Sequence, residues 1–311
     1  MLDYEKNIVG RIALVSDPHY STDSKESEEK WFPWFCTLLR KINPSGRLVK
    51  KFLDFWDRKT QEAFENVIGR VKKLQPYDLL VGLGDYTPGA NESGMLTQKT
   101  RKQYAIFKKV LDKINCLKKL IWGDHDAGYR FNVKKRIGVK IGTEAGGVSV
   151  ESVKAATQLI GDPFGCFWVD KIKFIFISTN LVRNVGSASP EELKDLKIKQ
   201  ETFLAKTLYE SHEKVFVLLH DPTALHKETA VRKILDSHQQ KILAIIHGHM
   251  HAGFVQKLNM LAPVYFGLCL EYKTILVPAS WGFMGIGGGF AIMKIYDDGT
   301  YEIKKYKRKM K

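Results

Sequence analysis

The sequence predicts an α/β fold in which two mixed β-sheets are flanked by helices. Three observations support this prediction. Short apolar runs recur along the chain and end at polar residues, amphipathic helical patterns lie between several of these runs, and the carboxyl-terminal part is rich in β-branched and aromatic residues. Strands that alternate with helices are typical of folds with parallel sheets. Such sheets present functional groups at the carboxyl ends of their strands.

Five apolar runs are predicted to be strands. Each run has the length of a strand and lacks the alternation of a half-exposed one, so we expect burial on both faces. A polar residue follows each run directly or within two residues. The runs cover residues 12–15, 79–83, 120–122, 215–219 and 242–246.

Three segments are predicted to be helices. Apolar residues recur at helical spacing over residues 63–74 and 104–114, which is the pattern of a helix with one buried face. A third helix is predicted to begin near Ser189, with its hydroxyl as N-cap. Pro190 then fits the first helical position and Glu192 fits the capping-box position.

We expect a single domain over residues 1–311. The chain is 44% hydrophobic, which is enough for a sizeable core, and no linker, repeat or low-complexity tract divides it. Residues 264–303 are predicted to form strands of another sheet. Two segments stand apart from this body: an insertion at residues 20–58 and a basic tail at residues 304–311, where Lys and Arg occupy six of the eight positions.

The composition limits where the protein works and what it binds. The charged amino terminus lacks a signal-peptide pattern, and no apolar stretch approaches the ~20 residues of a membrane span, so we expect a cytoplasmic protein with no integral membrane segment. The four cysteines lie far apart, which fits neither a zinc ribbon nor a disulfide framework. The net charge of +15 favours a phosphorylated anionic substrate, nucleic acid or a peripheral anionic membrane surface.

Residues that can bind metal ions follow the five predicted strands. Carboxylate and imidazole side chains suit divalent ions such as Mn²⁺, Fe²⁺ or Zn²⁺, and the set contains no thiolate. In order, the motifs are Asp17-Pro18-His19, Gly84-Asp85, Gly123-Asp124-His125-Asp126, His220 and Gly248-His249-Met250-His251. This series resembles the signature D-x-H, G-D, G-N-H-[DE], H, G-H-x-H of the calcineurin-like metallophosphoesterase superfamily, and it spans residues 17–251.

The resemblance implies a site for two divalent metal ions. The first ion is expected to bind Asp17, His19 and His251, and the second ion to bind Asp124, His220 and His249. Asp85 is expected to bridge both ions. In such sites a hydroxide held by the two metals attacks phosphorus in line with the leaving group.

The same resemblance assigns catalytic parts to two residues that are not ligands. His125 is expected to donate a proton or a hydrogen bond to the leaving oxygen, and Asp126 to orient the His125 imidazole and raise its pKa. The motif does not require His247, for which packing in the core or beside a ligand is the simpler hypothesis.

The sequence departs from the superfamily pattern at Asp124, where asparagine is usual. An anionic ligand in place of a neutral one should hold the second ion more tightly and make the site less attractive to phosphate. Asp85 is followed by Tyr86 and Thr87, which fits neither the protein serine/threonine phosphatases nor the purple acid phosphatases. The glycine-rich stretch 285–289 precedes a predicted strand, so we expect a loop or bulge there and no nucleotide-binding turn.

The insertion leaves the sheet just after Asp17 and His19. It combines aromatic residues such as Trp31, Trp34 and Trp56 with several cations, so a lid that meets an apolar substrate or an anionic membrane is one hypothesis. A helical insert packed on the sheet accounts for the same residues.

We therefore expect metal-dependent hydrolysis of a phosphodiester or pyrophosphate bond on a lipid- or nucleotide-linked substrate. The UDP-diacylglucosamine pyrophosphatases are similar at the level of the fold, but they have arginine where this chain has His125. A nuclease or cyclic-nucleotide phosphodiesterase is the alternative that the charge also favours. A non-catalytic scaffold is the second alternative, although scaffolds of this origin lose ligands that this chain retains.

Overall fold

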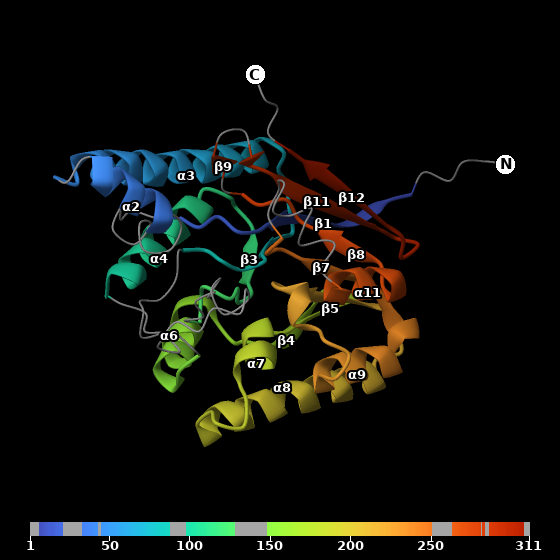
Figure 1. Ribbon diagram of the computed structural model, residues 1–311. Coiled ribbons are helices and arrows are strands. Elements are labelled where there is room, and N and C mark those ends of the chain that lie inside the picture. Colours follow the sequence, from blue (N-terminus) through green and yellow to red (C-terminus); the bar gives the residue numbers. More distant parts are fainter. Residues whose placement is uncertain are drawn as a thin grey trace.

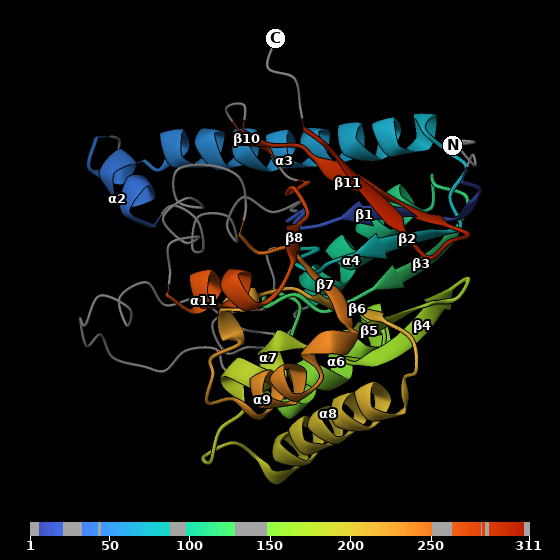
Figure 2. The ribbon, with the colours of Figure 1, turned by 90° about the vertical axis from the view of Figure 1, so that its right-hand side faces the viewer.

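Two five-stranded sheets lie face to face, and helices cover the outer face of each (Figures 1 and 2). This architecture confirms the predicted fold class. The computed structural model describes residues 6–20, 33–42, 45–87, 98–127, 148–250, 263–280, 282–283 and 286–307. Among the helices in these ranges, none combines the length and apolar character that crossing a membrane requires.

The first sheet has the order β12-β11-β1-β2-β3. Its central strands β1, β2 and β3 are parallel, whereas β11 is antiparallel to β1 and forms a hairpin with β12. The carboxyl ends of the parallel strands therefore meet at one end of this sheet. The strands are β1 (Ile8–Val15), β2 (Leu79–Gly82), β3 (Leu117–Leu120), β11 (Phe290–Tyr296) and β12 (Tyr301–Tyr306).

The second sheet has the order β4-β5-β6-β7-β8. Strands β5 to β8 are parallel, and β4 is paired to β5 as an antiparallel edge. The strands are β4 (Gly165–Val169), β5 (Ile172–Phe176), β6 (Val215–Leu219), β7 (Ile242–His247) and β8 (Thr274–Leu276). A short separate hairpin consists of β9 (Gly282–Phe283) and β10 (Ile286–Gly287).

The central core fills the space between the two sheets. Alternate residues of each strand point inward, so Ile12 and Leu14 from the first sheet pack with Phe216, Leu218 and Ile246 from the second. The residues between them face outward and pack against helices. This double burial explains why strands such as β6 are continuously apolar.

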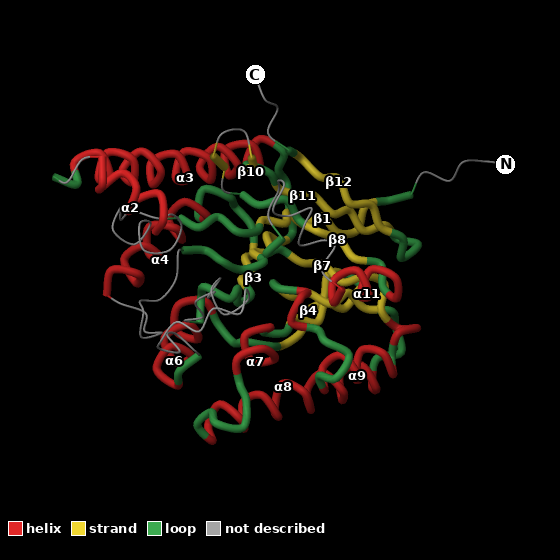
Figure 3. Tube along the Cα trace, viewed as in Figure 1, coloured by secondary structure: helices red, strands yellow, loops and turns green. Residues whose placement is uncertain are grey.

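The helices form the two outer layers, as the red coils of Figure 3 show. Helices α3 and α4 cover the first sheet, while α8, α9 and α11 pack on the second. The helices are α2 (Pro33–Ile42), α3 (Arg47–Lys73), α4 (Gln98–Leu111), α6 (Val150–Ile160), α7 (Thr179–Asn184), α8 (Glu191–Glu210), α9 (Ala230–Ser237) and α11 (Pro263–Glu271). The 3₁₀ turns η1 (Pro222–Ala224) and η2 (Gln239–Lys241) follow β6 and α9.

Two sequence-based predictions need correction. Residues 264–303 form strands of another sheet only in part: α11 is a helix that packs Leu268 onto the second sheet, β8 joins the second sheet, β9 and β10 pair with each other, and β11 and β12 extend the first. Helix α8 begins at Glu191, and the Ser189 hydroxyl caps nothing in it but accepts a hydrogen bond from Gly186 N at 3.0 Å. In both cases a non-local or loop contact outweighs the local pattern.

The segment 20–58 contains α2 and the first part of α3. The positions of residues 21–32 and 43–44, and the side chains of Trp34, Phe35 and Trp56, lie outside the described part, so the lid stays a prediction. The second half of α3 packs on the first sheet through Phe64, Val67 and Ile68.

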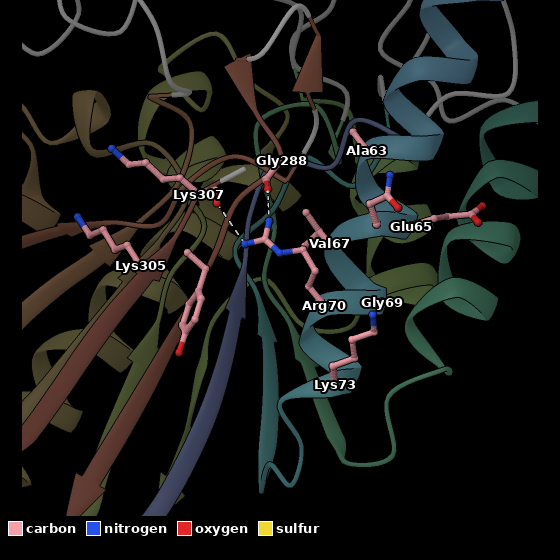
Figure 4. A pocket seen from close by; sticks show the side chains of 11 residues that line it. Ala63, Glu65, Val67, Gly69, Arg70, Lys73, Gly288, Lys305 and Lys307 are labelled. Carbon is pink, nitrogen blue, oxygen red and sulfur yellow. Dashed lines mark hydrogen bonds between the residues drawn. The ribbon is translucent and has the colours of Figure 1, made fainter. Parts of the chain in front are cut away.

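A cavity of 660 Å³ lies between α3 and the end of β12 (Figure 4). There Arg70 donates hydrogen bonds to Gly288 O at 3.2 Å and to Lys307 O at 3.1 Å. None of the candidate metal ligands in the described part of the chain lines this cavity. We therefore interpret it as a gap at the contact between α3 and the glycine-rich loop. The candidate active site is identified from side chains elsewhere.

Candidate metal centre

The predicted ligands that the structure describes come together where strands of both sheets end. The chain after β1 runs beside the chain after β2, because Asp17 N donates to Gly84 O at 3.1 Å and His19 N donates to Asp85 O at 3.0 Å. From the other sheet, Asp17 accepts hydrogen bonds from His249 N at 3.1 Å through both carboxylate oxygens. The two sheets thus share one site at their carboxyl ends.

Glycines precede several ligands because the loops approach one another closely. A Cβ atom on Gly248 would lie 1.9 Å from the Ser16 hydroxyl and 2.7 Å from Asp17 Oδ2. A Cβ on Gly123 would lie 2.2 Å from Asp85 N. Only glycine fits such approaches, which explains the Gly-Asp and Gly-His pairs of the motif.

The backbone is strained at four of the candidate ligands. Asp17, His19, Asp85 and His249 have φ angles of 48°, 42°, 57° and 62°. In the described part of the chain Asp170, in the turn between β4 and β5, is the one other non-glycine residue with positive φ. Positive φ costs about 1–3 kcal/mol at such residues and persists where surrounding structure imposes it, typically at functional sites.

Four side chains form the most compact group of candidate ligands. Asp85, Asp124, His220 and His249 each offer one atom within 4.8 Å of the others. His220 Nε2 lies 2.8 Å from Asp124 Oδ1 and 3.1 Å from Asp85 Oδ2. His249 Nδ1 lies 3.1 Å from the same Asp124 oxygen. These are the three residues expected at the second ion together with the expected bridge.

The protonation of His220 tests whether a cation fits this group. Its Nδ1 lies 2.6 Å from Leu83 O, which can only accept, so Nδ1 carries the proton. In the neutral ring, Nε2 then points a lone pair at two carboxylate oxygens. Nε2 and Asp124 Oδ2 are also buried without a hydrogen-bond partner. A divalent cation satisfies all of these acceptors at once, so the residues fit a metal ion.

The pKa values show the same excess of negative charge. Burial opposes a charged imidazole, but Asp85 and the other carboxylates outweigh it and raise the pKa of His220 well above its usual range. Burial also opposes the charged form of His249, but Asp221 and Asp124 outweigh it and raise the pKa of His249 to about 9. The two histidines in turn hold the pKa of Asp124 well below normal, against the effect of burial. The site therefore attracts cations.

A second group consists of His19, Asp85 and His125. His19 Nε2 and His125 Nε2 lie 3.7 and 3.9 Å from Asp85 Oδ2, and the two rings meet edge to face at 5.1 Å. Asp85 belongs to both groups, as a bridging ligand would. Asp17 is fully buried beside them, and His251 lies outside the described residues. The geometry places His125 among groups able to reach a metal, so its expected role as a non-ligand stays a prediction.

Asp126 is buried, and its carboxylate accepts four hydrogen bonds. Its Oδ2 accepts from Asp85 N and Gly123 N, both at 2.8 Å. Its Oδ1 accepts from Tyr86 N at 3.1 Å and from the Tyr104 hydroxyl. These four bonds occupy the lone-pair positions of the carboxylate, which favours a structural role for Asp126 in place of the orienting role expected from the sequence. Burial, followed by the charge of Asp85, raises the pKa of Asp126 to about 7.

Asp126→Asn is expected to lower the free energy of unfolding by at least about 2 kcal/mol. Whichever way the amide is oriented, its NH₂ group faces a backbone N–H, and buried donors are left unpaired. Urea denaturation measures this loss. Tyr104→Phe, which removes a single bond to Asp126, should cost about 1 kcal/mol. Full stability of Asp126→Asn would show that these hydrogen bonds do not hold the loop.

Asp221 and Arg183 are functional candidates that sequence reasoning missed. Asp221 Oδ2 lies 3.7 Å from His249 Nε2 and is paired with the Arg183 guanidinium. Burial opposes ionisation of Asp221, but His249 and Arg183 lower its pKa. A carboxylate on the outer nitrogen of a ligating histidine fixes the ring and its tautomer. The position of Asp221 directly after His220 was the available signal, while Arg183 carries none in the sequence.

His247 is not part of the metal group. Its ring is fully buried, with Nδ1 3.0 Å from Gly248 O and Nε2 3.2 Å from the Tyr265 hydroxyl. Burial lowers the pKa of His247 to about 4. It is a neutral residue that packs beside the site, in agreement with the simpler hypothesis.

Comparisons with known proteins agree with this geometry. The model of the family described as calcineurin-like phosphoesterase matches residues 10–253. The fold is similar to the crystal structure of a dimetal phosphatase from Danio rerio, with a TM-score of 0.55, 15% sequence identity and 96% of each chain covered. No curated protein matches the sequence.

Proposed function

The chain belongs to the calcineurin-like phosphoesterase family, and from that membership we propose that it hydrolyses a phosphodiester or pyrophosphate bond with two divalent metal ions. The observation that carries this proposal is the position of Asp85, which lies in both groups of candidate ligands. One carboxylate shared by two groups is the arrangement that holds two ions close together. When bound, such ions polarise the phosphoryl group and supply an activated water.

The residues of the chain divide into holding and assisting roles. Asp124, His220 and His249 hold one side of the site and Asp17, His19 and His251 the other, with Asp85 between them. His125 keeps 18% of its side chain exposed beside Asp85, so it faces solvent from which a substrate enters. We assign His125 the donation of a proton to the leaving oxygen, which is the task of a general acid.

Asp221 and Arg183 support the site from behind His249. The Asp221 carboxylate accepts from the Thr223 backbone N at 2.8 Å and from its hydroxyl at 2.6 Å, so it is held in place before it meets the imidazole. Asn180 of α7 donates to Gly123 O at 2.8 Å and fixes the loop that carries Asp124. Loops held in this way keep ligands in position without the metal.

We propose manganese as the resident metal and a lipid- or nucleotide-linked substrate. Oxygen and imidazole ligands without sulfur support a borderline to hard ion. The high net positive charge supports an anionic substrate.

A substrate panel tests this function. Phosphomonoesters, cyclic nucleotides, nucleotide-sugar lipids and single-stranded DNA would be incubated with the full chain and Mn²⁺, Mg²⁺ or Zn²⁺. Hydrolysis of a diester or pyrophosphate well above that of monoesters supports the proposal. Cleavage restricted to DNA or cyclic nucleotides would favour the nuclease or cyclic-nucleotide alternative, and no hydrolysis with any metal would favour a scaffold.

Asp124→Asn is expected to weaken the second ion while leaving a working enzyme. The amide keeps an oxygen for the metal but lacks the negative charge that both His220 and His249 approach. Titrating hydrolysis with Mn²⁺ should show half-activation at a concentration about tenfold higher or more, with turnover recovered at saturation. An unchanged titration would mean that Asp124 does not bind the ion through its carboxylate.

A further inference from the structure

Helix α11 is apolar on both of its faces, and one of these faces is exposed. Phe266 and Leu270, one turn apart, are 53% and 73% exposed, whereas Tyr265 and Leu268 are buried against the second sheet. The one charged residue of α11 is Glu271 at its end. A helix that is apolar all round is normally buried, because its outer face would otherwise be hydrated. The outer face of α11 therefore calls for a partner.

Helices α2 and α3 carry a second set of exposed apolar residues. Leu38 and Ile42 of α2 are 46% and 67% exposed, and Leu48 and Phe55 of α3 are 41% and 40% exposed. Each pair lies on one helix face, four or seven residues apart. The two helices are held together by a small cluster of their own, in which Val49 packs with Leu39 and Phe52. Leu38, Ile42 and Leu48 lie outside this cluster, whereas the Phe55 ring is contacted by Arg58 and Lys59.

Positive charge surrounds these apolar residues. Over residues 38–59 the sequence has seven cationic side chains and two acidic ones. The cations are Arg40, Lys41, Arg47, Lys50, Lys51, Arg58 and Lys59. Exposed Leu, Ile and Phe among Lys and Arg are the composition of helices that lie in the interface of an anionic bilayer.

The three helices lie on the same side of the molecule. Figure 2 shows α2, the beginning of α3 and α11 toward the left, and in Figure 1 α2 and the beginning of α3 lie at the upper left while α11 lies at the right. Helix α8 lies at the bottom in both views. Along the chain, α2 and α11 are the first described elements after Tyr20 and Met250, which flank the metal centre. The apolar side chains are therefore on the next described elements after these two residues.

We propose that α2, the first part of α3 and α11 form a docking surface for an anionic lipid bilayer. The apolar residues enter the acyl boundary, and the Lys and Arg side chains meet the phosphate and carboxylate groups of anionic lipids. Charge decides between a membrane and a second copy of this chain. A symmetric dimer through this surface would bring the same cations against each other, whereas an anionic bilayer neutralises them.

Co-sedimentation of the full chain with vesicles tests this surface. Vesicles of phosphatidylcholine with phosphatidylserine are expected to bind the protein, and vesicles of phosphatidylcholine alone are expected to bind it weakly. Ile42→Ser combined with Leu270→Ser should lower the partition coefficient by about tenfold or more, since two large apolar side chains are lost from the interface. Lys50→Gln with Lys51→Gln should lower binding to anionic vesicles and remove part of its salt sensitivity.

Matched controls come from α8. Ile198 and Tyr209 are 57% and 77% exposed, so Ile198→Ser with Tyr209→Ser makes a comparable loss away from the proposed surface. Lys199→Gln with Lys206→Gln matches the change in charge. All four variants alter exposed residues, so thermal unfolding and hydrolysis of a small soluble phosphodiester should match wild type.

Two results would overturn the docking surface. One is binding of the Ile42/Leu270 variant to anionic vesicles that is no weaker than that of wild type or of the α8 apolar control. The other is a dimer in lipid-free solution, measured by light scattering, that becomes monomeric in the Ile42/Leu270 variant, which would identify the surface as an interface between copies. Neither result depends on which phosphoester the metal centre hydrolyses.

Discussion

Asp85→Asn is expected to reduce hydrolysis by about 10³-fold or more, which is at or above the largest loss from removing one transition-state hydrogen bond. The substitution preserves shape: the amide oxygen can still accept the bond that His125 N makes to Asp85 Oδ1 at 2.9 Å. What disappears is the anionic Oδ2, which lies 3.1 Å from His220 Nε2 and 3.7 Å from His19 Nε2. Both candidate ion positions lose their shared ligand.

Asp170→Asn is the matched control for this variant. Asp170 also has positive φ, at 50° compared with 57° for Asp85, and asparagine tolerates that conformation. Steady-state hydrolysis of bis(p-nitrophenyl) phosphate with saturating Mn²⁺ measures both variants, and Asp170→Asn should match wild type. Activity of Asp85→Asn within a few-fold of wild type would contradict a bridging role.

His125→Ala is expected to reduce turnover by ~10²–10⁴ while two metal ions remain bound, because a general acid acts on the leaving group and not on the ions. The backbone bond from His125 N to Asp85 Oδ1 does not depend on the side chain. Elemental analysis of the purified variant measures the metal, and steady-state kinetics measure turnover.

The leaving group distinguishes a proton donor from a ligand. An alkyl alkoxide needs a proton to depart, whereas p-nitrophenolate scarcely does, so the loss in His125→Ala should be larger for an alkyl ester. His125 is near enough to Asp85 and His19 to be grouped with them as a ligand. Loss of one ion with an equal rate defect for both esters would show that it is one.

The fold class follows from the sequence because several strands are buried on both faces, although β3 is exposed or half-buried and the predicted run 120–122 overlaps it only at Leu120. Runs such as Val215–Leu219 are completely buried, and continuous burial leaves no ambiguity about where a strand lies in a two-layer core. Each run ends at a residue that would be costly to bury without a partner. The order of those residues therefore indicates the candidate ligands from the sequence alone.

Pairings between distant segments could not be predicted. β11 is hydrogen-bonded to β1 although almost the whole sequence lies between them, with Ile12 opposite Met293. The periodicity of a segment carries no information about which strands pair. The sequence predicts a strand where α11 lies, because its β-branched and aromatic residues favour strands locally. The packing of Leu268 and Tyr272 on the second sheet stabilises the helix instead.

The supporting residues of the site were visible only in three dimensions. Asp126 lies in the motif, yet its neighbours Tyr86 and Tyr104 come from the loop after β2 and from α4. Arg183 reaches Asp221 from a short helix that no motif marks. Sequence motifs record residues that the chemistry needs, whereas residues that position them depend on how loops meet.

The number of ions bound by wild type, His19→Ala and His249→Ala tests the central claim most directly. His19 and His249 belong to different candidate groups that share only Asp85. Elemental analysis after equilibration with Mn²⁺ and gel filtration should give two ions per chain in wild type, one in each single variant and none in the double variant. A single ion in wild type that either substitution alone removes would contradict a two-metal centre.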